Sequence, residues 1–173
     1  MNKHLQSVRE FREHFGFSRE EGRLSDMTIV LRQAWLMEGG KQVFLAIKQG
    51  DMTVILARLT GLAYLALNAV AMQGAEVNLQ PVSWQHDGSV LSLMRLIGDR
   101  INVCSSGLSE DYSALYCACA QLSGGFLNAD FDKSFGLFHR HQMETGTGRG
   151  QGTEDRSEVE WNRLPDLSDC LYE

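Results

Sequence analysis

Among the side chains of the stretch 25–74, Glu38, Lys41 and Arg58 are the ones whose positions indicate possible chemistry. The two cations could bind a phosphate or another acidic ligand through charge-assisted hydrogen bonds. A single carboxylate is less useful, because Mg²⁺ needs near-octahedral oxygen coordination, usually from carboxylates, substrate phosphates and water together. The simpler alternatives are a solvated Glu38, and an Arg58 that pairs with an acid such as Glu38 or extends to solvent.

Familiar catalytic motifs do not occur in this sequence. There is no G-x-x-x-x-G-K-[ST], G-x-S-x-G or H-E-x-x-H. His139 and His141 are two residues apart, so a helix would separate them by about 200°, unlike the i, i+4 spacing of a helical zinc pair. The chain has four cysteines, Cys104, Cys117, Cys119 and Cys170, without a C-x-x-C pair. We therefore expect reduced thiols, and assign no catalytic residue and no metal ligand.

Apolar residues at intervals of three and four predict a chain of six helices. The first covers 2–17, and the second runs from a cap at Ser25 or Asp26 to about Gln49. The third follows a stop and a new cap at Gly50-Asp51; the others are expected over 89–103, from Ser109, and from 128–132 onward. The apolar stripe expected on the second helix is Val30, Ala34, Met37, Phe44 and Ile47, and that on the third is Ile55, Leu59, Leu62, Ala66 and Ala69.

The second and third helices also resemble a known metal-binding hairpin. Leu31 to Gln42, Ala46 to Asp51 and Ile55 to Tyr64 are similar to the all-α nucleoside triphosphate pyrophosphohydrolases, which include MazG-like and phosphoribosyl-ATP pyrophosphohydrolase-like proteins. In that family E-E-x-x-E on one helix, and E-x-x-D with a further Asp one turn on, hold magnesium. The corresponding residues here are Glu38, Gly39 and Gln42, then Val54, Ala57 and Gly61. Only one carboxylate remains, so the resemblance implies the fold without the usual mechanism.

Weaker similarities extend over most of the chain. Residues 8–16 resemble the opening helix of the phosphoribosyl-ATP pyrophosphohydrolase-like subgroup, and 164–167 resemble the Pro-Pro-Asp-Leu of its tail. A polar segment of the same subgroup resembles the residues from Asp130 onward, because Asp130-Phe131, Phe135, His139 and Met143 match it. Where the subgroup has Ser-Asn and Ser-Lys, this chain has His141-Gln142 and Glu144-Thr145. By this resemblance Arg58 lies near the carboxylate stripe, and the candidate ligand-binding residues are Glu38, Lys41, Arg58 and His139.

The vacated metal site has two possible fates. If Gly39, Ala57 and Gly61 face one another as in the family hairpin, they leave either a pocket or an unusually close helix contact. An Arg58 that points inward would favour an anionic ligand, and one that points outward would favour a dry contact. Gly39-Gly40 should either break the second helix or allow close approach of another backbone, because each glycine costs up to about 1 kcal/mol in a helix interior.

We therefore expect an all-α fold, with a MazG-like four-helix-bundle core and additional helices over 1–145 and a polar, Gly-rich tail over 146–173 partly packed on the body. The expected function is nucleotide or phosphate binding, or regulation, without Mg-dependent hydrolysis and without a cofactor. One alternative is an active enzyme that cleaves a nucleoside triphosphate to monophosphate and pyrophosphate, with magnesium on relocated ligands. The nearest carboxylates are Glu20, Glu21, Glu38 and Asp51. The other alternative is a protein-interaction or structural module.

Charge and hydropathy indicate the expected surroundings. A net charge of -6 and a pI near 5.4 argue against non-specific nucleic-acid binding. The N-terminal residues lack the apolar core of a signal peptide, so we expect a cytoplasmic protein. Residues 54–72 approach the roughly 20 needed to span a bilayer, but Arg58 and Asn68 make spanning costly. We expect a buried helix instead, covered in a homodimer.

Overall fold

The structure is a computed structural model that describes residues 1–84, 87–146 and 157–173. These residues form six α-helices and two short 3-10 helices. The elements are α1 (Lys3–His14), α2 (Asp26–Gln49), α3 (Met52–Met72), α4 (Val90–Val103), η1 (Cys104–Ser106), α5 (Ser109–Gly125), α6 (Phe131–Thr145) and η2 (Ser168–Cys170). The expected all-α fold is confirmed.

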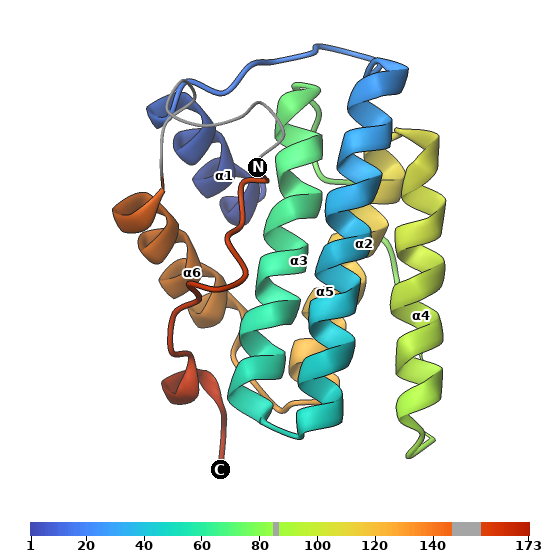
Figure 1. Cartoon of the computed structure of the whole chain (residues 1–173), viewed down its shortest axis with the longest axis vertical. Coiled ribbons are helices and arrows are strands. Elements are labelled where there is room, and N and C mark those ends of the chain that lie inside the picture. The colour runs from blue at the N-terminus through green and yellow to red at the C-terminus, as the bar shows by residue number, and fades with distance from the viewer. Residues whose placement is uncertain (85–86, 147–156) are drawn as a thin grey trace.

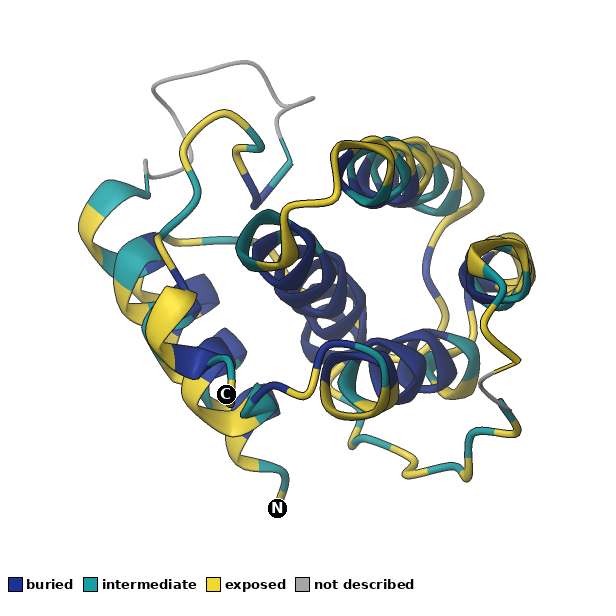
Figure 2. Cartoon of the chain, turned by 90° about the horizontal axis from the view of Figure 1, so that it is seen from below, coloured by how far each residue is buried: buried dark blue, intermediate teal, exposed yellow. Residues whose placement is uncertain are grey.

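The helices form a bundle around α3. Helices α2, α3, α5 and α4 contact one another in that cyclic order, while α1 and α6 pack together on the other side of α3 (Figure 1). Figure 2 shows α3 in the middle of the molecule, buried along most of its length. A bundle with this arrangement needs one apolar helix at its centre, and the sequence of α3 has that composition.

Helix α3 is the one helix in the described parts of the chain that is long and apolar enough to cross a membrane. Its predicted stripe is buried, and 89% of its most apolar window lies inside the protein. The cover comes from α1, α2, α5 and α6 of the same chain rather than from a second copy. The reason for expecting a homodimer at this helix is therefore wrong, and the homodimer itself stays a prediction.

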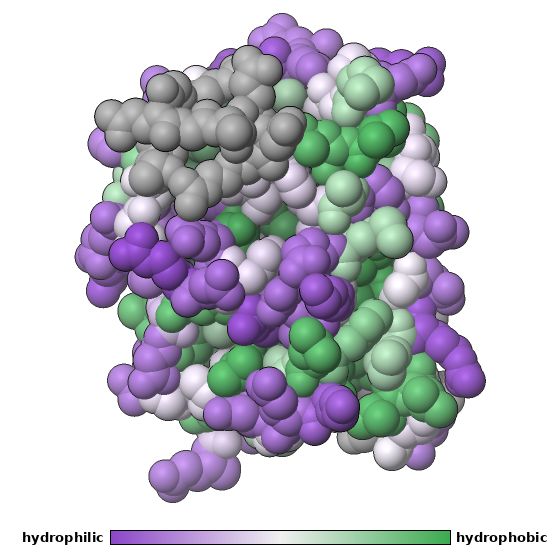
Figure 3. Space-filling view, in the orientation of Figure 1, coloured by the Kyte–Doolittle hydropathy of each residue, from purple (hydrophilic) through white to green (hydrophobic). Residues whose placement is uncertain are grey.

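Helix α2 turns a different face to the core from the one predicted. Val30 and Met37 are 61% and 62% exposed, and Ala34 is exposed as well. The buried face consists of Arg32, Leu36, Gly39, Gly40, Val43 and Ala46. The predicted stripe is wrong at Val30, Ala34 and Met37, because arginine and glycine occupy core positions that hydropathy alone does not identify. Its other two members, Phe44 and Ile47, are partly buried against the core. Figure 3 shows hydrophobic side chains gathered along α2 on the outer surface.

The glycine pair in α2 allows a neighbouring helix to approach closely and does not break α2. The helix runs unbroken through Gly39 and Gly40 to Gln49. A Cβ atom on Gly40 would lie 2.7 Å from Cδ1 of Ile101, so α2 and α4 are closer there than a larger residue allows. Small residues thus position α2 between its neighbours.

Polar caps begin the three helices that frame the candidate site. The side chains of Ser25, Asp51 and Asp130 accept hydrogen bonds from first-turn backbone N–H groups of α2, α3 and α6. Gly50 adopts a left-handed φ of 78°, which glycine tolerates and which makes the tight α2–α3 turn. Ser109 begins α5 as predicted, and Leu108 holds the cap position without a side-chain hydrogen bond.

All four cysteines are free and buried. Burial is the main reason that the pKa of the Cys104 thiol is raised, to about 12, with Asp111 adding to the effect. Burial also raises the pKa of Cys119. Both of these thiols therefore stay protonated and poorly nucleophilic at neutral pH.

His4 on α1 is buried against α5 and α6. Its Nδ1 lies 2.8 Å from the Tyr116 hydroxyl, its Nε2 lies 3.1 Å from Oδ1 of Asp132, and its ring stacks on Phe135. Burial lowers the pKa of His4 to about 4, although Asp132 acts in the opposite direction. The folded protein therefore holds this histidine neutral.

Stability should fall as the pH is lowered from 6.5 toward 4. In this window the unfolded chain binds a proton at His4 that the folded chain does not, and the loss by pH 5 is about 2 kcal/mol. Urea denaturation at pH 7.5 and pH 5 measures this loss of stability. His4→Gln should reduce the difference between the two pH values, whereas His14→Gln, at an exposed position of the same helix, should leave it unchanged. The same pH dependence of the free energy of unfolding in both variants would contradict the assignment of this effect to His4.

Candidate functional site

The C-terminal segment, residues 157–173, lies on the body of the protein. In Figure 1 it runs in red down the front of the molecule, beside α6 and α3. Its far end is tied to the α5–α6 loop, because the backbone of Cys170 accepts from the Asp130 N–H at 2.8 Å and the Tyr172 N–H donates to Asn128 at 3.0 Å. Leu167 and Cys170 are buried. We call the surface that contacts residues 157–164 the tail site.

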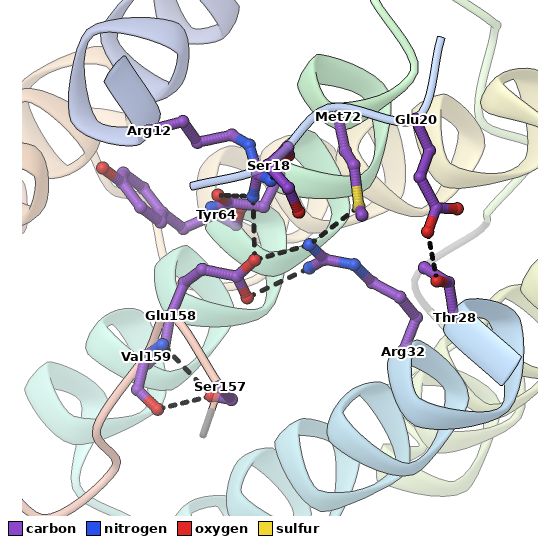
Figure 4. Close-up of polar contacts among 11 residues, drawn as sticks. Arg12, Ser18, Glu20, Thr28, Arg32, Tyr64, Met72, Ser157, Glu158 and Val159 are labelled. Carbon is purple, nitrogen blue, oxygen red and sulfur yellow. Dashed lines mark hydrogen bonds and ion pairs between the residues drawn. The ribbon is translucent and has the colours of Figure 1, made fainter. Parts of the chain in front are cut away.

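Glu158 places a carboxylate between two buried arginines. Nη2 and Nη1 of Arg32 lie 2.5 and 3.0 Å from its two oxygens, and Nη1 of Arg12 lies 3.0 Å from Oε1 (Figure 4). The contact joins α1, α2 and a residue more than a hundred positions away in sequence. Such two-sided guanidinium contacts are among the strongest hydrogen bonds available to a carboxylate.

The rest of the ion cluster satisfies the arginines from within the body. Arg12 also donates to Oδ1 of Asn68 at 3.1 Å and to the backbone oxygen of Ser18 at 2.7 Å. Arg12, Arg32 and Asn68 are only 5%, 4% and 0% exposed. A buried charge is tolerated only when it is paired and hydrogen-bonded, so these groups depend on one another.

The Glu158 carboxylate is ionised within the cluster. Burial would raise the pKa of Glu158, but Arg32 and then Arg12 outweigh it and hold the pKa below its usual value. The carboxylate is therefore ionised at neutral pH, and two guanidinium groups share it.

Trp161 lies against Gly39 and Gly61, two of the small residues that were predicted to face one another. A Cβ atom on Gly61 would lie 2.8 Å from Cζ3 of its indole, and one on Gly39 would lie 3.0 Å from Cζ2 and 2.9 Å from Cδ1 of Leu62 on α3. The ring edge thus lies against both glycines. The chain's own tryptophan therefore occupies the space beside the two glycines, while Leu62 also packs α3 directly on α2 at Gly39.

Arg58 fixes the same tryptophan. Its Nη1 donates to the backbone oxygen of Trp161 at 2.7 Å, and its guanidinium lies 5.9 Å from the centre of the indole ring. Burial lowers the pKa of Arg58, and Glu38 partly offsets this. Arg58 therefore neither extends freely to solvent nor pairs directly with Glu38.

Glu38 and Lys41 lie on the outer side of α2. Nε2 of Gln42 donates to Glu38 at 2.8 Å, and Nζ of Lys41 lies 3.7 Å from the same carboxylate. Lys41 is exposed. The structure brings these two candidates together with each other, but not with Trp161 or the buried arginines.

His139 forms a separate contact between α6, α3 and α1. Its Nδ1 lies 3.1 Å from the Tyr64 hydroxyl and its Nε2 lies 3.5 Å from Oε2 of Glu10. Burial lowers the pKa of His139 and Glu10 opposes this, while burial, then Glu158 and Glu10, raise the pKa of Tyr64. A neutral histidine bonded to a protonated tyrosine is a positioning contact, and no nucleophile is activated here.

The carboxylates considered as relocated metal ligands are used elsewhere. Glu20 accepts from the Ser25 backbone and the Thr28 hydroxyl, and Asp51 caps α3. Glu21 is exposed. Within residues 1–84, 87–146 and 157–173, no three His, Cys, Asp or Glu side chains are grouped to hold a metal ion. With Trp161 against Gly39 and Gly61, the residues present do not fit a magnesium site.

A basic cavity opens beside the ion cluster. It has a volume of about 330 Å³ and is lined by Arg9, Arg12, Glu13, Gly16, Phe17, Arg19 and Ala71. Arg9 is held by the backbone oxygen of Ala75 and by Glu76, at 2.7 and 2.9 Å. Arg12 therefore belongs to both the cavity and the ion cluster.

Sequence analysis missed most of this site. Arg12, Arg32, Glu158 and Trp161 were not among the candidates. A signal was present for the arginines, since Arg12 falls on the same helical face as Leu5 and Val8, at intervals of three and four. An arginine on an apolar face indicates a buried partner. Nothing local identifies that partner as Glu158.

Comparisons with known proteins found no match among family models, curated proteins or solved structures. Functional reasoning therefore starts from these side chains and their geometry.

Proposed function

We propose that this protein is a non-hydrolytic regulatory protein that binds a phosphate-bearing ligand, of which a nucleotide is the expected kind, on a MazG-like arrangement of helices. The proposal depends mainly on one observation: Arg12 lines the basic cavity and also binds Glu158 of the C-terminal segment. A cytoplasmic location, a homodimer and the absence of nucleic-acid and membrane partners remain predictions that accompany it.

The shared arginine gives such a ligand a way to act at a distance. A phosphate in the cavity would compete with Glu158 for charge-assisted hydrogen bonds from Arg12. Any loosening of Glu158 by the ligand requires that tail release strengthens ligand binding by the same factor. The C-terminal segment would then report ligand binding.

Hydrolysis is not part of the proposal. Glu38, the one carboxylate that remains from the family pattern, is bonded to Gln42, and Trp161 occupies the space between the glycines. Magnesium-assisted phosphoryl chemistry needs carboxylates that fix the metal beside the phosphates. The geometry therefore favours binding over turnover.

We expect pyrophosphate release from common nucleoside triphosphates at millimolar Mg²⁺ to stay at the rate of the protein-free control. A coupled pyrophosphate assay measures this. Turnover that is abolished both by EDTA and by Glu38→Ala would refute the non-hydrolytic assignment and support the enzyme alternative.

Phosphate binding should depend on the exposed arginine of the cavity. Arg19→Ala should weaken the binding of pyrophosphate or ATP about tenfold, since a charge-assisted hydrogen bond contributes about 1.5–3 kcal/mol, less at an exposed site. Arg23→Ala removes the same charge from an exposed position outside the cavity and should leave affinity nearly unchanged. Calorimetric titration measures both. No binding by the wild type, or equal losses in the two variants, would sink the proposal.

A further inference from the structure

We infer that the tail site is a peptide-binding site, and that it accepts the C-terminal segment of a second copy of this chain when its own segment has left. This goes beyond the proposed phosphate binding and does not depend on it. The contacts of residues 157–164 carry the inference, because the body binds them as a receptor binds an extended peptide.

Three side chains of the body form hydrogen bonds with backbone carbonyls of the segment. Nε2 of Gln142 donates to the carbonyl of Glu158 at 3.3 Å, and Nη1 of Arg58 donates to that of Trp161 at 2.7 Å. Nε2 of His141 lies 2.6 Å from the carbonyl of Arg163. Side chains bonded to several backbone carbonyls of one irregular stretch provide affinity without a helix or sheet partner.

The segment's own side chains provide specificity. Glu158 enters the buried Arg12–Arg32 pair, Val159 is buried, and the Trp161 indole lies on the two glycines. An aromatic anchor in a fitted space beside a buried charge pair is the usual composition of a binding hot spot. The recognised pattern is thus an acidic residue, an apolar residue, and a tryptophan three positions after the acid.

A second copy of the chain is the occupant whose chemistry matches the site. Every copy carries this sequence, so Glu158 of one copy complements the Arg12–Arg32 pair of another. Residues 147–156 are the whole covalent connection between Gly146 and Ser157, and ten residues can span at most about 35 Å. Exchange of an identical element between copies needs no new contact, since each contact is remade on the partner.

The test uses the full chain with a specific protease sequence inserted between Gly146 and Ser157. After cleavage, the segment should stay associated with a folded body on gel filtration, with the helical circular dichroism unchanged. A fluorescent synthetic peptide of residues 157–173 should then exchange into the site, seen as a rise in anisotropy. The Glu158→Ala peptide should bind at least tenfold more weakly. The Asp169→Ala peptide, changed at an exposed residue of the same charge in the same segment, should bind like the parent.

Three outcomes overturn the inference. The first is that the body unfolds on cleavage, which would make the segment an ordinary part of the core. The second is that the labelled peptide fails to exchange below the unfolding temperature. The third is that the two alanine peptides bind equally. The Arg19→Ala variant provides a separate readout, because loss of phosphate binding with intact peptide exchange would refute the proposed function and leave this inference standing.

Discussion

Replacing Glu158 by alanine is expected to lower the free energy of unfolding by about 3–5 kcal/mol. The change removes the carboxylate that Arg12 and Arg32 share, so both buried guanidinium groups lose this charge partner. Removing one partner of a buried ion pair costs far more than the pair itself contributes, because the remaining charge stays desolvated. Urea denaturation at neutral pH measures the loss.

Two control variants separate charge from chain position. Asp169→Ala removes the same charge from an exposed position of the same segment, and should cost less than about 0.5 kcal/mol. Glu158→Gln keeps the shape and loses the charge, so its free energy of unfolding should lie close to that of the alanine variant. If alanine at Glu158 and at Asp169 were equally mild, the buried cluster would not anchor the segment.

Replacing Trp161 by alanine is expected to destabilise the protein by about 2–4 kcal/mol, somewhat below the 3–5 typical of fully buried tryptophans because this ring is half-buried. The loss comes from the space left between Gly39 and Gly61 and from the ring that Arg58 covers. Thermal and urea unfolding both report it. Trp161→Phe should recover part of the loss.

A second substitution at Gly61 makes this prediction sharper. In the wild type, Gly61→Ala should destabilise, because its Cβ would lie 2.8 Å from Cζ3 of Trp161 and 3.3 Å from Cζ of Phe138. In the Trp161→Ala background most of the clash is gone, and alanine should stabilise through its helix propensity, by up to about 1 kcal/mol. An effect of the same sign in both backgrounds would place Trp161 elsewhere.

Periodicity and capping were sufficient to predict the helices. Ser25, Asp51 and Asp130 cap α2, α3 and α6, and the stripe of α3 from Ile55 to Ala69 is buried. These are local properties: a cap bonds within one turn, and a stripe repeats within one helix. The sequence of α3 is apolar on nearly every side, so its central position could be inferred without tertiary information.

The candidate site depended instead on long-range pairing. Val30 and Met37 are apolar yet exposed, while Arg32 takes a core position because Glu158 neutralises it from the far end of the chain. Hydropathy assigns each residue a preference without its partner, so a paired buried charge is invisible to it. Gly39 and Gly61 were recognised as small, but only the fold brings Trp161 to them.

The tail contacts connect the proposed ligand to the rest of the molecule. Arg12 touches the basic cavity, Glu158 and Asn68 at once, so it joins α1, α3 and the C-terminal segment. A phosphate that binds Arg12 would first weaken the contacts of Glu158 with the body. It would then weaken those of Trp161, three residues later in the same segment. The environment of the Trp161 ring therefore reports directly on the central claim, that the chain's own tail occupies the space beside Gly39 and Gly61.

Fluorine NMR of protein labelled with 5-fluorotryptophan tests that claim most directly. The chain has three tryptophans, and Trp161→Phe identifies the resonance of Trp161 by its loss. We predict one resonance well separated from that of the free 157–173 peptide, unmoved by millimolar Mg²⁺ alone and shifted in Gly61→Ala. A Trp161 resonance at the position of the free peptide, or one that moves on addition of Mg²⁺ alone, would contradict the account.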